Sequence, residues 1–71
     1  MRSFSTEKSS RITSIDYDPE SRTMRVVFKR GGVYEYFEVP QEVFDGLIQA
    51  QSLGKAFEEH VKGKYRYSRL V

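Results

Sequence analysis

The sequence predicts an α+β domain in which a three-stranded antiparallel meander packs against two helices. Residues 23–30 alternate apolar and polar side chains with a period of two, which is typical of a strand with one buried face. Gly31 and Gly32 follow at the position of a hairpin turn. Beyond Pro40 the apolar residues recur at helical spacing instead. Because each element has one apolar face, packing the helices onto the sheet would bury all of these faces.

Three segments carry strand signals, because they combine β-branched and aromatic residues with turn residues at their ends. They are residues 11–18, 23–30 and 33–39. A turn around Pro19 separates the first segment from the second, and Pro40 ends the third. In this order they form the predicted meander.

The second half of the chain predicts two helices. Pro40 suits the start of the first, since a missing N–H costs nothing in the first helical turn. Ser52 is a suitable N-cap for the second, and Gly63 occupies the place of a C-terminal glycine. The apolar faces consist of Val43, Phe44, Leu47 and Ile48 in the first helix, and of Leu53, Ala56, Phe57, His60 and Val61 in the second. Residues 64–71 fit either an extra C-terminal strand or an extended arm.

A chain of 71 residues is long enough for one domain. The serine-rich residues 1–10 predict a flexible lead-in, which leaves residues 11–71 as the single domain. No apolar run approaches the roughly 20 residues of a membrane span, and the N-terminus lacks the apolar region of a secretory signal. We therefore expect a cytoplasmic protein that does not contact membranes.

The residue types needed for catalysis or metal binding are scarce. The chain has no cysteine and a single histidine, His60, which is too few ligands for a typical zinc site. The acidic residues 16–20 lack the central glycine and terminal glutamate of an EF-hand loop. No nucleophile stands beside a general base. The sequence therefore predicts a protein that is not an enzyme, with no cofactor, metal or small-molecule substrate.

Two hairpin registers place the central tyrosines on opposite faces of the sheet. A two-residue turn would put Tyr34 and Tyr36 on the face that carries Arg25 and Lys29. Such an exposed platform of rings and cations is typical of surfaces that bind single-stranded nucleic acid. It would, however, place Glu35 on the core face, where burial of a carboxylate is costly.

A three-residue turn shifts the register by one and turns every side chain to the other face. Phe28 then lies opposite Tyr34, and Val26 opposite Tyr36, so that both tyrosines face the helices. We favour this register because it leaves Glu35 in solvent. It would also expose an apolar strip that could bind a protein partner or a second copy of the chain. The strip consists of Val27, Val33 and Phe37.

The C-terminal tail combines cations with aromatic rings. Four cations and no acid lie in residues 62–71. Cations neutralise phosphates and rings stack on unpaired bases, so the tail predicts RNA binding. The predicted contacts comprise Lys64, Arg66 and Arg69 with phosphates, Tyr65 and Tyr67 with bases, and Arg25 and Lys29 along an extended path. The same cations could instead complement a helix C-terminus and keep the domain soluble.

The chain resembles the KTSC domain over about residues 9–67. The segments that carry the resemblance are SSRITSIDYD, MRVVFKRGGVYEYFEVP and FDGLIQAQSLGKAFEEHVKGKYRY. Its most specific features are Tyr34-x-Tyr36, Val39-Pro40, Tyr17-Asp18 and Ala50-x-Ser52-x-Gly54. The KTSC domain occurs at the C-terminus of some lysyl-tRNA synthetases and as a short stand-alone protein in bacteria and phages. The resemblance implies no assigned activity, a suggested role in RNA binding, and a matching tyrosine pair at Tyr34 and Tyr36.

Two functions follow as hypotheses. The first is a small non-catalytic accessory domain that binds RNA through its basic, tyrosine-rich surface. The alternative is a module for protein interaction or self-association that uses the exposed sheet face or a free strand edge.

Overall fold

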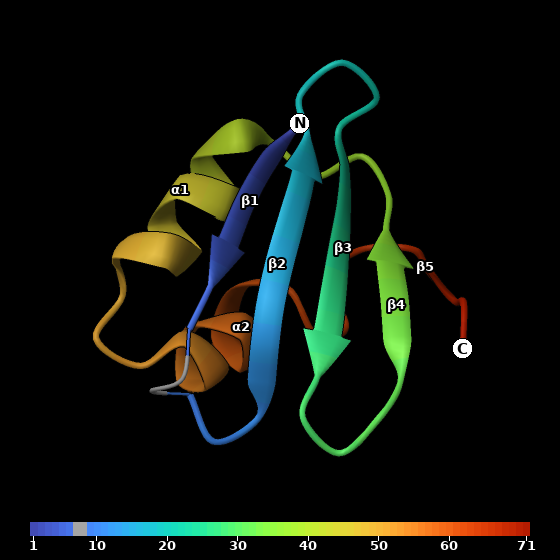
Figure 1. The fold of residues 1–71 in the computed structure, drawn as a ribbon. Coiled ribbons are helices and arrows are strands. Elements are labelled where there is room, and N and C mark those ends of the chain that lie inside the picture. The colour runs from blue at the N-terminus through green and yellow to red at the C-terminus, as the bar shows by residue number, and fades with distance from the viewer. Residues whose placement is uncertain (7–8) are drawn as a thin grey trace.

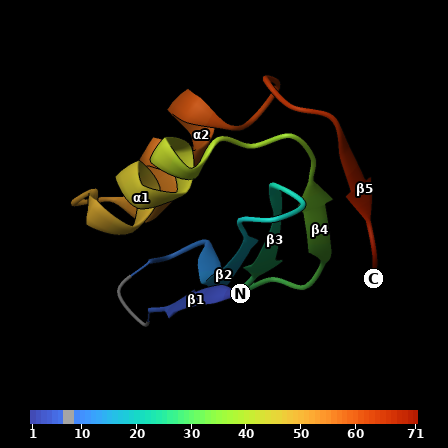
Figure 2. The ribbon, with the colours of Figure 1, turned by 90° about the horizontal axis from the view of Figure 1, so that it is seen from above.

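In the part of the chain that the structure describes, five antiparallel strands form one sheet, and both helices lie against one of its faces (Figures 1 and 2). The structure, a computed structural model, describes residues 1–6 and 9–71. The strands follow one another across the sheet in chain order. They are β1 (Arg2–Ser5), β2 (Ile12–Asp18), β3 (Thr23–Phe28), β4 (Val33–Tyr36) and β5 (Tyr67–Arg69). The helices α1 (Gln41–Gln49) and α2 (Leu53–His60) lie between β4 and β5 in the chain.

The predicted α+β class is confirmed, but a three-stranded meander undercounts the sheet. The tail forms the extra strand β5, which pairs with β4. Residues 2–5, where we expected part of a flexible lead-in, form the edge strand β1. Phe4 pairs with Ile15 and packs against the core, and Arg2 bonds Asp45 of α1 at 2.8 Å. Residues 7 and 8 of that expected lead-in lie outside the described residues.

The β3–β4 hairpin has the tyrosines on the helix-facing side, as in the favoured register, and the exposed-platform register is wrong. Its loop is longer than three residues, however, so that Val26 pairs with Tyr34 and Met24 with Tyr36. Each tyrosine thus pairs with the β3 residue two positions before its expected partner. Side chains alternate with a period of two, so a shift of two residues changes the partners and keeps the faces. Within the loop, the Phe28 N–H donates to the Gly32 carbonyl at 3.1 Å.

The core lies between the sheet and the two helices. At its centre, the Tyr17 ring stacks on Phe44 with 5.2 Å between ring centroids. The Tyr17 side chain is 1% exposed, and its hydroxyl donates a 2.6 Å hydrogen bond to the Val39 carbonyl. This bond ties β2 to the segment that leads into α1. The fully buried core also includes Ile12, Ile15, Met24, Val26, Leu47 and Val61.

Helix α2 begins at the predicted cap and ends close to the predicted glycine. The Ser52 hydroxyl accepts a hydrogen bond from the Lys55 N–H at 3.3 Å. Gly63 follows the helix with a φ of 77°, a conformation that favours glycine. Of the two residues predicted at the end of the apolar face of α2, Val61 is buried as expected, whereas the His60 side chain is exposed. In the described part of the chain, neither helix has the length and apolarity to cross a membrane.

Replacement of Ser52 by alanine is expected to lower the free energy of unfolding by about 1 kcal/mol, because the Lys55 N–H loses its acceptor. Urea unfolding followed by circular dichroism measures the change. The control is Ser10→Ala, which alters an exposed serine outside the helices. Equal stability of the Ser52 variant and the wild type would show that the cap contributes nothing.

Candidate nucleic-acid interface

An open groove of about 560 Å³ lies between α2 and the helix-facing side of β3, β4 and β5. We call it the aromatic groove. Its rings belong to Phe28, Tyr34, Tyr36, Phe57 and Tyr67. They come from four different elements, so only the folded chain brings them together. Figure 2 shows β5 beside β4 at the edge of the sheet furthest from β1.

The rings of the aromatic groove contact one another directly. Tyr36 and Phe57 meet edge to face with their centroids 5.5 Å apart, and Phe28 meets Tyr34 in the same way at 5.5 Å. Tyr67 lies over both β4 tyrosines, at 5.7 Å from Tyr34 and 5.5 Å from Tyr36. Alternate residues of β4 share a face, and the pairing of Tyr36 with Tyr67 places the β5 ring on that same face.

The three tyrosines differ in how far they reach solvent. Tyr67 is 58% exposed, whereas Tyr36 is 6% exposed. Burial, together with the nearby Tyr67 and Tyr34 phenols, raises the pKa of Tyr36. Its hydroxyl therefore stays protonated at neutral pH and can donate a hydrogen bond. In the described part of the chain, no fully buried side-chain polar atom is unpaired and no hydrogen bond engages this hydroxyl, so it opens into the groove.

Three cations of the described residues lie in or beside the aromatic groove. The Arg69 guanidinium carbon lies 5.6 Å from the Tyr34 centroid, and its Nε donates to the Val71 carbonyl at 2.9 Å. Lys62 lines the groove and makes no ion pair within residues 1–6 and 9–71. Arg11 also lines the groove, in an ion pair with Glu58 of α2. Because Glu58 also lines the groove and pairs with Arg11, the positive charge offered to an anionic ligand comes from Lys62 and Arg69.

Four of the predicted contact residues meet at this groove: Tyr34, Tyr36, Tyr67 and Arg69. The others lie elsewhere. Arg25 is on the opposite face of the sheet, where it bonds Glu35 at 3.0 Å. Arg66 covers Phe37 at 5.5 Å from its ring centroid. Lys29 and Lys64 are exposed in loops, and Tyr65 packs against the core.

Several residues of the groove were absent from the predicted RNA-contact set, among them Phe57 and Arg11. Phe57 was assigned only to the apolar face of α2, and Arg11 only to the start of a strand. The period of a helix indicates which residues face the sheet but not which strands they meet. Their contribution to the groove depends on the packing of α2 against β3 and β4, which no local pattern encodes.

The apolar strip expected to bind a protein is interrupted. Val27 and Val33 pair directly with each other on the face away from the helices. Glu35 lies between Val33 and Phe37 along β4, and its ion pair with Arg25 places charge across the middle of the strip. Two valines and a covered phenylalanine therefore do not form a continuous apolar surface.

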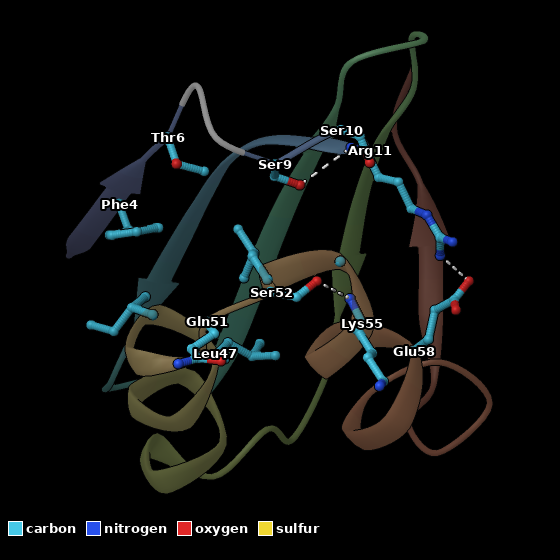
Figure 3. Close-up of a pocket in the computed structure, with 14 residues that line it drawn as sticks. Phe4, Thr6, Ser9, Ser10, Arg11, Leu47, Gln51, Ser52, Lys55 and Glu58 are labelled. Carbon is cyan, nitrogen blue, oxygen red and sulfur yellow. Dashed lines mark hydrogen bonds and ion pairs between the residues drawn. The ribbon is translucent and has the colours of Figure 1, made fainter.

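A second, more polar hollow of about 610 Å³ lies at the N-terminal end of α2, on the side of β1 (Figure 3). Its polar wall includes Ser9, Ser10, Ser52 and Lys55. The Ser9 hydroxyl accepts hydrogen bonds from two backbone N–H groups, which fixes it in place. We call this hollow the polar hollow. Three residues line both it and the aromatic groove: Arg11, Gly54 and Glu58.

In the described ranges, no three residues among the histidines, aspartates and glutamates form a group that could hold a metal ion. The acidic turn at residues 16–20 instead contains a local hydrogen bond. The Glu20 N–H donates to the Asp18 carboxylate at 3.0 Å, and this bond lowers the pKa of Asp18. Such a hydrogen bond is typical of a turn stabilised by its own aspartate.

The fold and the groove together define a small α+β domain with a ring-lined groove at one end of its sheet. The KTSC domain family matches residues 8–65, and the chain belongs to this family. A crystal structure of a KTSC domain protein from Yersinia pestis is similar, with a TM-score of 0.92 and 33% identity. The similarity covers 99% of this chain and 97% of that one. The resemblance inferred from the sequence is thus confirmed.

Two kinds of protein are similar to this chain in sequence. An uncharacterised protein of Stutzerimonas stutzeri is 42% identical over 64 residues, which is 89% of this chain and 90% of that protein. A lysine–tRNA ligase of Nostoc punctiforme is 37% identical over 59 residues, which is 83% of this chain. The matched part is only 10% of the ligase, so the ligase carries a KTSC domain beside much larger regions. The family is therefore found both as short proteins and within an enzyme.

Proposed function

We propose that this KTSC domain is a non-catalytic accessory domain that binds single-stranded RNA in the aromatic groove. One observation carries the proposal: Tyr34, Tyr36 and Tyr67 converge on one open groove beside Arg69 and Lys62. Rings and cations in one groove match the two chemical parts of a nucleotide. The rings suit the base, and the cations suit the phosphate.

A single strand fits this groove better than a duplex. Bases in a duplex are stacked on their neighbours, and their faces are not available to a protein. Unpaired bases can stack on exposed rings, each stack contributing about 1–3 kcal/mol. Tyr67 offers the most exposed ring, and the Tyr36 hydroxyl supplies a hydrogen-bond donor within the groove. The relatives named lysine–tRNA ligases support the choice of RNA, since a tRNA has unpaired loops and an unpaired end.

The proposal is tested by two-dimensional amide NMR while a mixed single-stranded RNA is added at about 50 and 200 mM salt. We expect saturable shifts at Tyr34, Tyr36 and residues 62–69, with weaker binding at the higher salt because phosphate contacts release counterions. The control titration uses a duplex of the same sequence, which should shift fewer resonances. The absence of shifts with single-stranded RNA at low salt would contradict the proposal.

Amide NMR of the protein alone, recorded at increasing concentration, bears on the alternative of a protein-interaction module. Shifts confined to Val27, Val33 and Phe37 at rising protein concentration, without RNA, would indicate self-association through the opposite face. The Arg25–Glu35 ion pair on that face makes it the less favoured surface. Sedimentation equilibrium of the wild type and of Phe37→Asp measures the same property independently.

A further inference from the structure

Arg11 occupies the boundary between the two hollows. Its side chain lines both the aromatic groove and the polar hollow, and it is joined there by Glu58 (Figure 3). A strand that leaves the aromatic groove along α2 toward the polar hollow must cross this residue. Arg11 follows Ser10 immediately before β2, so its backbone is held by the sheet while its side chain reaches α2.

Gly54, in the first turn of α2, lies beside the side chain of Arg11. A Cβ atom at Gly54 would come within 3.4 Å of the Arg11 Cδ and 3.7 Å of its Cβ. These distances are ordinary van der Waals contact, so the aliphatic part of Arg11 passes next to the first turn of α2, with space for a methyl group between them. The guanidinium is held at this turn by its ion pair with Glu58.

The ion pair of Arg11 with Glu58 is one that a ligand can replace. Both side chains are about half exposed, at 55% for Arg11 and 43% for Glu58. Exposed ion pairs contribute little, because water competes with them and both side chains lose freedom. A guanidinium matches the geometry of phosphate oxygens as well as that of a carboxylate. A phosphate at this boundary could thus accept hydrogen bonds from the Arg11 guanidinium in place of Glu58. The Glu58 side chain would then turn into solvent.

We infer that Arg11 binds a backbone phosphate of the strand whose base occupies the aromatic groove, and that Glu58 is a built-in competitor for this cation. The inference rests on the proposed function and adds a residue and a regulatory contact to it. In the free protein Glu58 neutralises Arg11 and repels an approaching phosphate. Removal of the Glu58 charge therefore strengthens binding, although the carboxylate lies in the site itself.

The test compares four proteins by fluorescence anisotropy with a labelled single-stranded RNA at about 50 mM salt. Glu58→Gln is expected to bind about 3–10-fold more tightly than the wild type, since it frees Arg11 and removes a repulsion. Arg11→Ala is expected to bind more weakly than the wild type. The double variant Arg11→Ala/Glu58→Gln should lose most of the gain, because the competitor acts through Arg11.

Glu59→Gln is the matched control, because it removes the same charge from the neighbouring residue, which does not line either hollow. Amide NMR spectra verify that each variant keeps the fold. Equal affinities of Glu58→Gln and Glu59→Gln, with binding by the wild type intact, would overturn the role of Arg11 and leave the proposed function standing. A wild type that binds no RNA would overturn both.

Discussion

Replacement of Phe44 by alanine is expected to lower the free energy of unfolding by about 3–5 kcal/mol. Phe44 is 1% exposed and stacks on Tyr17, and Arg2 of β1 lies 5.0 Å from the centre of its ring. The substitution thus opens a cavity between α1 and the sheet and removes a contact of the edge strand. Folded domains are stable by about 5–15 kcal/mol, so this loss would remove a large share of the stability of a domain at the lower end of that range.

Urea unfolding followed by circular dichroism measures the effect of Phe44→Ala, and amide NMR shows whether the variant folds. Val43→Ala is the matched control, because Val43 lies on the same helix and is only half-buried. We expect the control to lose much less stability, since it removes fewer atoms from a less enclosed position. A similar loss in both variants would contradict the central place of Phe44 in the core.

Replacement of Tyr67 by alanine is expected to weaken the binding of single-stranded RNA by about 5–150-fold, which corresponds to the roughly 1–3 kcal/mol of one stacked base. Tyr67 is the most exposed ring of the aromatic groove and lies over both β4 tyrosines. Because it is largely outside the core, the domain should fold without it. Fluorescence anisotropy with a labelled RNA measures the change.

Two further variants separate the contribution of the Tyr67 ring to RNA affinity from the contributions of its hydroxyl and of the neighbouring residue. Tyr67→Phe keeps the ring and should retain most of the affinity if stacking is the main contribution. Ser68→Ala alters the neighbouring residue, which pairs with Glu35 and faces the opposite side of the sheet, and should bind as the wild type does. Unchanged affinity in Tyr67→Ala would exclude this ring from the RNA site.

Much of the fold could be predicted because its signals are local. The spacing of Val43, Phe44 and Leu47 indicated α1, and the Ser52 cap indicated the start of α2. The strand β1 was missed because its residues, Arg2–Ser5, are mostly small and polar. It is held in place by distant partners: Phe4 against the core and Arg2 against α1.

The candidate site was predicted only in part for a related reason. Tyr67 and Arg69 stand out in the sequence because rings and cations alternate in the tail, whereas Tyr34 and Tyr36 stand out as a closely spaced tyrosine pair. Arg25 is also a cation, and it was predicted to be an RNA contact. In the structure it lies on the other face of the sheet and pairs with Glu35. The charge and chemical type of a side chain indicate what it can bind. The face of the sheet on which it lies determines whether it can contribute to a given site.

The sequence by itself determined the family and the two helices, because these depend on motifs and on a period of 3.6 residues. It favoured one face for the two β4 tyrosines but left two hairpin registers open, and the structure decided between them. Only the tertiary structure decided the strand partners, the length of the β3–β4 loop and the contacts of Tyr36 with Phe57 and Tyr67. It also decided that Arg11 stands beside Glu58. These contacts join residues that are far apart in the chain, and they form because burial of the shared apolar faces brings whole elements together.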